Sequence, residues 1–206
     1  GSCFQTLSPA GTFSHTDHGF PDVMFLRDPN EFKGVLPYMY TFLPDHPAHL
    51  HFIGIGGVSM SGIAAILLDR GFTVSGSDSH ETEMTRQLEE AGCHIVYEQT
   101  AQNITDDIDA VVYTAAIHPQ NPEYAAAVEK GLPLLSRAEL LGQLMTFYHT
   151  PICVSGTHGK TTTTSMAAHI LMAAELDPTI SVGGVLPLIG GNYHIGNTET
   201  FLLEAC

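Results

Sequence analysis

Basic residues are scarce in this 206-residue sequence, which contains seven Lys and Arg against 22 Asp and Glu. With histidine neutral, the formal net charge is -15 at pH 7. Negative charge of this size repels nucleic acids and anionic membrane surfaces, so neither is expected as a main partner. Anionic ligands must instead be held locally, by backbone N–H groups and a few well-placed cations.

Cysteines and long apolar runs are also scarce. The four cysteines, Cys3, Cys93, Cys153 and Cys206, form no C-x-x-C pair, so neither a zinc site nor a disulfide framework is predicted, and a reducing cytoplasm is the expected location. No apolar run approaches the roughly 18 residues that a membrane span needs, and no basic-then-apolar leader opens the sequence.

Residues 1–38 fit poorly with the remainder, because they show neither strand-like alternation nor a helical stripe. Gly1 and Ser2 resemble the remnant of a protease-cleavage site, and Met39 is a candidate for the natural start. We interpret this segment as an appendage of unknown role. His15, Asp17 and His18 within it are more simply an exposed polar loop than a metal site.

The strongest motif lies between residues 151 and 165. A short run rich in β-branched residues leads into a turn at residues 156–159, and Lys160 opens a segment with helical apolar spacing. The apolar residues of that segment are Met166, Ala167, Ile170, Leu171 and Ala174. Such a turn aims backbone N–H groups at one point, where the helix dipole also favours an anion.

The turn resembles the P-loop pattern G-x-x-x-x-G-K-[ST], although Val154 stands where the first glycine is expected. Lys160 is expected on the β- and γ-phosphates of ATP, and the Thr161 hydroxyl on Mg²⁺, so both are predicted catalytic residues. The predicted ATP-binding residues are Gly156, Thr157, His158, Gly159, Lys160, Thr161 and Thr162.

A second glycine-rich turn follows an apolar run near residue 50. Residues 50–55 are predicted to form a strand, residues 54–62 a tight turn, residues 63–69 a helix and residues 72–75 a second strand. Asp78 then lies about 20 residues beyond the turn, where a Rossmann unit contacts a ribose. Ser59 replaces the third glycine of that pattern, so glycines that merely let helix and strand pack closely are the alternative interpretation.

The alternation of strands and helices continues to the end of the chain. Further helices are predicted at residues 81–91, 122–130 and 137–148, and further strands at residues 94–97, 110–114, 132–135, 179–182 and 201–205. The predicted fold class is therefore α/β, with a Rossmann-like parallel-sheet domain at residues 39–149 and the beginning of a P-loop α/β domain at residues 150–206. The loop that leads to Asn121 leaves a strand end, so ligand binding and helix capping are both open interpretations of it.

Taken in this order, the motifs resemble those of the Mur ligases of bacterial cell-wall synthesis. The resemblance is carried by residues 51–62, 74–78, 116–123, 137–139 and 156–164, and it extends from about Met39 to the last residue. It implies a Rossmann-like domain that grips a UDP-sugar and a central ATPase domain that continues past Cys206. A chain of this length is then expected to bind the UDP-sugar but not to turn over alone.

The resemblance also implies a reaction. ATP phosphorylates the carboxylate of UDP-N-acetylmuramic acid, and the amine of L-alanine attacks the acyl phosphate to give an amide. The implied cofactors are ATP and Mg²⁺, with Thr161 and Glu204 as metal ligands. The residues that the resemblance places at the UDP-sugar are Gly54, Gly56, Gly57, Met60, Ser61, Asp78, Ala116, His118 and Asn121.

Four alternatives stay open. A related ligase that attaches a recycled peptide to the same UDP-sugar shares these motifs, and a nucleotide-sugar-binding module would use them without catalysis. An NAD-dependent dehydrogenase would leave Lys160 unexplained, whereas a generic P-loop kinase would leave the first glycine-rich turn unexplained. Binding of the UDP-sugar compared with binding of NAD separates the dehydrogenase from the others.

Overall fold

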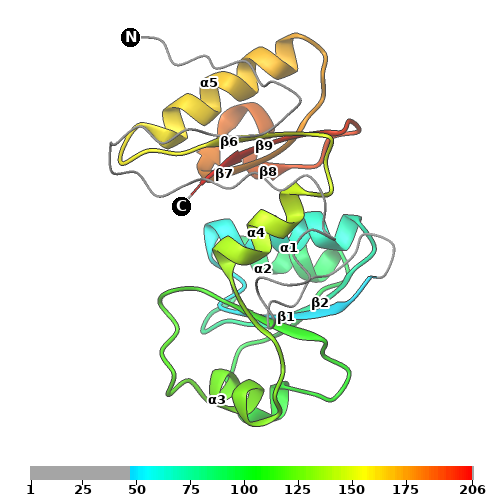
Figure 1. Ribbon diagram of the computed structural model, residues 1–206, viewed down its shortest axis with the longest axis vertical. Helices are drawn as coiled ribbons and strands as arrows, with labels where there is room; N and C mark the ends of the chain where they lie inside the picture. Colours follow the sequence, from blue (N-terminus) through cyan, green and yellow to red (C-terminus); the bar gives the residue numbers. More distant parts are fainter. Residues whose placement is uncertain (1–46, 206) are drawn as a thin grey trace, which may run out of the picture. The chain divides into compact units, whose positions relative to one another are not determined.

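Two β-sheets with flanking helices make up the computed structural model, which describes residues 47–205 (Figure 1). The appendage predicted at residues 1–38, with His15, Asp17 and His18, lies outside the described residues, as do Met39, Cys3 and Cys206. None of the described helices is long and apolar enough to cross a membrane. The predicted α/β class is confirmed.

The first sheet has five strands in the order β3-β2-β1-β4-β5, and every neighbouring pair is parallel. Its strands are β1 (His49–Ile53), β2 (Thr73–Ser77), β3 (His94–Val96), β4 (Ala110–Tyr113) and β5 (Leu134–Ser136). The helical segments around it are α1 (Val58–Asp69), α2 (Glu83–Glu90), the 3₁₀ turn η1 (Ala101–Asn103), α3 (Pro122–Glu129) and α4 (Arg137–Met145). The strand order reverses between β1 and β4, and ligands of such sheets bind at that switch point.

Both faces of the first sheet are buried, and β4, with the sequence Ala-Val-Val-Tyr, shows the continuous apolar run expected of such a strand. On one face, Leu50 and Phe52 of β1 join a large core with residues of α1 and α4. On the other face, Ile53 packs with Val111 of β4 and Ala127 of α3. The carboxyl ends of β1 and β4 are thereby held between two covered faces.

The second sheet has four strands in the order β6-β9-β7-β8. They are β6 (Thr150–Val154), β7 (Thr179–Leu186), β8 (Gly191–His194) and β9 (Thr200–Glu204), with α5 (Lys160–Ala173) after β6 and the 3₁₀ turn η2 (Pro187–Ile189) after β7. β9 is parallel to β6 and β7, whereas β8 is antiparallel to β7. The sequence pattern missed β8 and the end of β7, because glycines there supply no side-chain alternation.

The two sheets share packing within one compact unit. Phe201 and Leu203 of β9 belong to the same hydrophobic core as β1 and α1, and the rings of Tyr148 and Phe201 stack with centroids 4.7 Å apart. The buried Asn192 side chain of β8 donates to the Val58 carbonyl of α1. The predicted boundary between residues 149 and 150 falls between the sheets and stays a prediction, since the core spans it.

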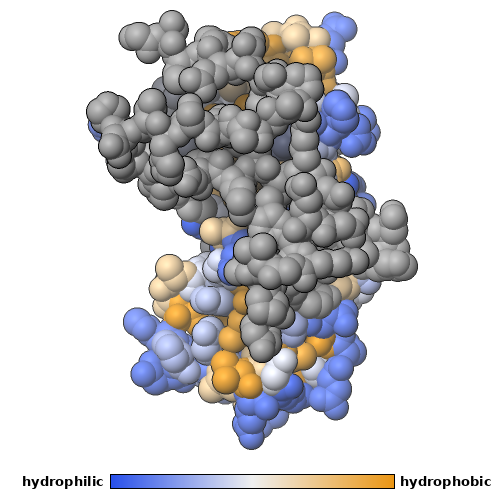
Figure 2. All heavy atoms as spheres, viewed as in Figure 1, coloured by the Kyte–Doolittle hydropathy of each residue, from blue (hydrophilic) through white to orange (hydrophobic). Residues whose placement is uncertain are grey.

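One local expectation was wrong. The tight turn predicted over residues 54–62 ends at Gly57, because α1 already begins at Val58 and buries Gly62 against Asn192 and Tyr193. The apolar spacing in α5 predicted the helix correctly but does not mark one buried face, since Met166 is 56% and Ile170 69% exposed. Figure 2 shows hydrophobic residues at the surface near the C-terminal end of this helix.

Candidate functional site

The glycine-rich turn after β1 is held by the carboxylate of Asp78. The Gly56 N–H donates to Asp78 Oδ2 at 2.8 Å, and the Ser79 N–H donates to Asp78 Oδ1 at 2.7 Å. A Cβ at Gly56 would lie 2.8 Å from that Oδ2 atom, so only glycine fits. The Gly54 N–H donates to the Ser77 carbonyl at 2.8 Å, which ties the turn to the end of β2. Asp78 thus shapes the turn, and its predicted ribose contact stays a prediction.

Met60 and Ser61 lie in the first turn of α1, directly after Gly57 at the helix N-cap. Both side chains are buried, and Ser61 Oγ lies 3.0 Å from the Val58 carbonyl, to which it donates. Their side chains therefore belong to the core of the first sheet. The predicted contact of these two residues with a UDP-sugar would have to use backbone N–H groups at the helix start.

The loop after β4 combines exposed residues with a helix cap. Ala116 and His118 are exposed at the switch point of the first sheet. Asn121 Oδ1 accepts hydrogen bonds from the N–H groups of Glu123 and Tyr124 at 3.0 and 3.2 Å. The capping interpretation of Asn121 is confirmed, while its role at a ligand stays a prediction.

Glu123 is a buried carboxylate in the first turn of α3. Its side chain is 0% exposed, Oε2 accepts from Ser77 Oγ at 2.5 Å, and Oε1 accepts from Asn103 Nδ2 at 2.6 Å. His51 Nε2 lies 3.5 Å from Oε1. Glu123 thereby fastens α3 to the end of β2, on the edge where the two loops of the switch point emerge. The only sequence signal was the presence of polar residues, His51 and Ser77, within apolar strands.

The second glycine-bearing turn joins β6 to α5. Gly159 is the N-cap of α5 and has a φ of 77°, a left-handed conformation that glycine adopts without strain. Lys160 Nζ donates to the Gly156 carbonyl at 2.9 Å, so the cation lies over the turn. Thr157 Oγ1 and His158 Nδ1 are hydrogen-bonded at 2.9 Å. The first backbone N–H groups of α5, where Thr161 and Thr162 lie, have no partner within the helix. Such groups bind anions at other helix starts.

Thr161 and Glu204 meet although 43 residues separate them in the chain. Thr161 Oγ1 donates to Glu204 Oε1 at 2.9 Å, and Glu204 Oε2 accepts from the Gly183 N–H at 2.9 Å. A hydroxyl and a carboxylate are oxygen ligands of the kind that Mg²⁺ binds. Between residues 47 and 205 there is no cluster of three or more His, Cys, Asp or Glu side chains able to hold a metal. Mg²⁺ at Thr161 would therefore need phosphate oxygens and water as further ligands.

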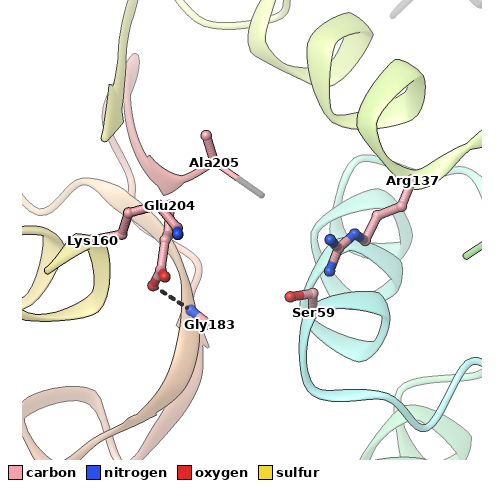
Figure 3. A pocket seen from close by; sticks show the side chains of 6 residues that line it. All are labelled: Ser59, Arg137, Lys160, Gly183, Glu204 and Ala205. Atoms are coloured by element: carbon pink, nitrogen blue, oxygen red, sulfur yellow. Dashed lines mark hydrogen bonds between the residues drawn. The ribbon is translucent and has the colours of Figure 1, made fainter. Parts of the chain in front are cut away.

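One pocket lies between the start of α1 and the start of α5. It has a volume of about 270 Å³ and is lined by Ser59, Arg137, Lys160, Gly183, Glu204 and Ala205. Ser59 and Arg137 lie on one side of it, and Lys160, Glu204 and Gly183 on the other (Figure 3). Sequence reasoning placed Arg137 in a motif but gave it no role, because only the packing of α4 brings it to the pocket.

The comparison with protein families matches residues 49–149 to the family described as "Mur ligase family, catalytic domain". The matched residues cover the first sheet and end just before β6. A UDP-N-acetylmuramate–L-alanine ligase of Lachnospira eligens is 61% identical over 168 residues, which are 82% of this chain and 37% of that protein. The chain belongs to the Mur ligase family. A Clostridium perfringens protein of the same name is 53% identical over 167 residues, 81% of this chain and 36% of that protein.

Solved structures of Mur ligases share the fold. The UDP-N-acetylmuramate–alanine ligase of Thermotoga maritima superposes with a TM-score of 0.69 at 36% identity, over 77% of this chain and 37% of that one. A UDP-N-acetylmuramate:L-alanyl-γ-D-glutamyl-meso-diaminopimelate ligase of Neisseria meningitides gives 0.70 at 33% identity, over 78% and 53%. This Mur ligase chain thus spans a little over a third of the curated relatives' length, and its fold resembles both kinds of ligase equally.

Proposed function

We propose that this chain supplies the UDP-sugar site and part of the ATP site of a ligase that joins L-alanine to UDP-N-acetylmuramate in peptidoglycan synthesis. The observation that carries the proposal is the pocket in which Ser59, one turn after the first phosphate turn, faces Lys160 and Glu204 of the second. A sugar nucleotide and ATP would meet there. The relatives of this chain, which are named for L-alanine ligation, support the choice of amine.

The ATP side of the pocket has the groups that phosphoryl transfer requires. Lys160 and the N–H groups at the start of α5 would hold the β- and γ-phosphates. Mg²⁺ bound by Thr161 and Glu204 would neutralise the negative charge of the transferred group. Transfer to a carboxylate needs little beyond such positioning and charge neutralisation, and the acyl phosphate formed is then open to attack by the amine.

The sugar-nucleotide side of the pocket is the switch point of the first sheet. Backbone N–H groups in the first turn of α1, at residues 58–60, would face the diphosphate beside Gly54, Gly56 and Gly57, while the loop with Ala116 and His118 would face the remainder of the nucleotide. A cytoplasmic location, expected from the scattered cysteines, agrees with this proposal.

The test is calorimetric titration of this chain with UDP-N-acetylmuramic acid, with ATP and Mg²⁺, and with NAD. Gly56→Val should abolish sugar-nucleotide binding and keep ATP binding, because its side chain displaces Asp78 from the turn. Lys160→Ala should abolish ATP binding and keep sugar-nucleotide binding, because it removes the cation over the second turn. Arg86→Ala is the matched control, since Arg86 is exposed on α2 and pairs with Glu81.

Saturable binding of NAD in place of the sugar nucleotide would contradict the proposal. So would unchanged binding of UDP-N-acetylmuramic acid in Gly56→Val, because the ligand would then bind elsewhere.

A further inference from the structure

Arg137 differs from the other cationic side chains of the described residues in having no protein partner. Residues 47–205 contain five Lys and Arg. The four with partners are Arg70 on the Tyr148 ring, Arg86 with Glu81, Lys130 with Asp106 and Lys160 with the Gly156 carbonyl. Arg137 makes no hydrogen bond or ion pair with any residue of the described range. In a chain with 22 acidic residues, a cation left without an acidic partner is available to a ligand.

The position of Arg137 is fixed by the start of α4. Ser136 caps this helix, with its Oγ accepting from the Glu139 N–H at 3.3 Å and Glu139 Oε2 accepting from the Ser136 N–H at 2.7 Å. Arg137 is the first residue of the helix, and its half-buried side chain extends into the pocket toward Ser59 (Figure 3). The guanidinium is thus presented by a well-anchored backbone.

The chemistry of the two residues indicates a planar anion. A guanidinium offers paired N–H donors that match the two oxygens of a carboxylate, and the Ser59 hydroxyl adds a third donor or an acceptor beside it. Across the pocket lie Lys160 and Glu204, where the γ-phosphate and Mg²⁺ are expected. A diphosphate would have its own donors in the backbone N–H groups of the first turn of α1, at residues 58–60. The anion at Arg137 is therefore best assigned to the group that reacts with ATP.

We propose that Arg137 binds the reacting carboxylate of the sugar nucleotide and directs it toward the γ-phosphate at Lys160. The assignment rests on the proposed function and adds the residue that holds the nucleophile. Two anions must come together for the reaction, and the guanidinium offsets their repulsion while fixing their orientation.

The chemical step that Arg137 serves is balanced without any proton transfer. A carboxylate oxygen forms a bond to the γ-phosphorus, and the bond from that phosphorus to the β–γ bridging oxygen breaks. The electron pair leaves with ADP, and the product is an acyl phosphate. Arg137 neither gains nor loses a proton in this step.

The test compares two sugar nucleotides on the intact chain by calorimetry. UDP-N-acetylmuramic acid carries the carboxylate, whereas UDP-N-acetylglucosamine has the same nucleotide and sugar with a free hydroxyl in its place. Arg137→Ala should weaken binding of the first about 10- to 100-fold, the usual range for a lost hydrogen-bonded charge. It should leave binding of the second unchanged, which also shows that the variant is folded. Arg137→Lys should bind UDP-N-acetylmuramic acid with an affinity between those of the unaltered chain and Arg137→Ala, because lysine keeps the charge but lacks the paired donors.

Three results would overturn the assignment. If Arg137→Ala weakens binding of both sugar nucleotides equally, Arg137 lies at the diphosphate. If the substitution weakens binding of ATP alone, Arg137 lies at the γ-phosphate. Unchanged binding of UDP-N-acetylmuramic acid would remove Arg137 from the site. If the unaltered chain binds neither sugar nucleotide, the proposed function itself fails, which is distinct from the other results. Arg86→Ala serves again as the control.

Discussion

The two strand–turn–helix units of this chain share the same order of elements and a glycine at the helix N-cap, but they differ strongly in burial. β1 lies in the middle of its sheet between β2 and β4, whereas β6 lies at the edge of the other sheet with β9 as its one neighbour in the described residues. Residues 60–67 of α1 are all buried, but in α5 only Thr164 and Ala168 are. A glycine-bearing turn between a strand and a helix therefore forms in this chain both where the helix is buried and where it is largely exposed.

The difference in burial implies a difference in how strongly each unit is held. Exposed large apolar side chains gather on the second sheet and its connections, at Met166, Ile170, Leu176, Val185 and Leu188. On the first sheet they are limited to Tyr97 and Val128 in the part of the chain that the structure describes. Burial of apolar area is the main stabilising contribution to folding, so the first unit should be the more stable.

The largest effect on stability is expected from shortening a buried side chain at the centre of the first unit. Phe52→Ala removes a side chain of β1 that is 0% exposed and should lower the free energy of unfolding by about 3–5 kcal/mol. Ile170→Ala, on the exposed side of α5, should change it by no more than about 0.5 kcal/mol. Urea denaturation followed by circular dichroism measures both. Similar losses in the two variants would mean that the burial contrast does not govern stability.

A smaller effect is expected from the buried carboxylate at the switch point. Glu123→Ala leaves the Ser77 hydroxyl without its acceptor and the Asn103 amide with only the Glu98 carbonyl, and it should lower the free energy of unfolding by about 1–3 kcal/mol. Glu123→Gln should cost less, because its amide oxygen still accepts from Asn103. The same denaturation experiment ranks the two variants. If glutamine proves as costly as alanine, the negative charge rather than the hydrogen bonding is what the site requires.

The hydrogen bond between Asn192 of β8 and the Val58 carbonyl of α1 joins the two units and should contribute about 1 kcal/mol to the free energy of unfolding. Asn192→Ala removes one donor to the Val58 carbonyl of α1, which keeps the Ser61 hydroxyl as a donor. Hydrogen exchange should then speed up in β8 and α5 while the amides of β1 keep their protection, since local opening is confined to the weaker unit. Faster exchange in β1 as well would show that the two units unfold together.

The smallest effect is an acid sensitivity confined to the second unit. A hydrogen bond from His194, aided by bonds from Asn197, lowers the pKa of Asp177 from 3.8 to about 2. Because the folded-state pKa lies below the unfolded value, the stabilisation is complete above about pH 4 and is lost as the pH falls toward 2. Thermal melting at pH 5 and at pH 2.5 should therefore show a larger drop for the native chain than for Asp177→Asn. Equal drops would contradict this assignment.

Sequence reasoning succeeded where chemistry is local. The turn at Gly156–Thr161 and the glycine-rich turn near Gly56 were predicted because glycine, lysine and threonine at those spacings have a direct backbone consequence. The cap at Asn121 was predicted for the same reason. Glu123 and the exposed face of α5 were not, because burial depends on which distant elements pack against a residue.

By itself, then, the sequence determined the α/β class, the two glycine-bearing turns and the helix caps, each of which depends on residues close together in the chain. Only the tertiary structure decided that Glu204 meets Thr161, that Glu123 is buried beneath the switch point, and that Arg137 faces Lys160 across a pocket. These pairings join strands and helices far apart in the chain. The physical reason is that sheet order and core packing, rather than residue spacing, set which distant side chains meet.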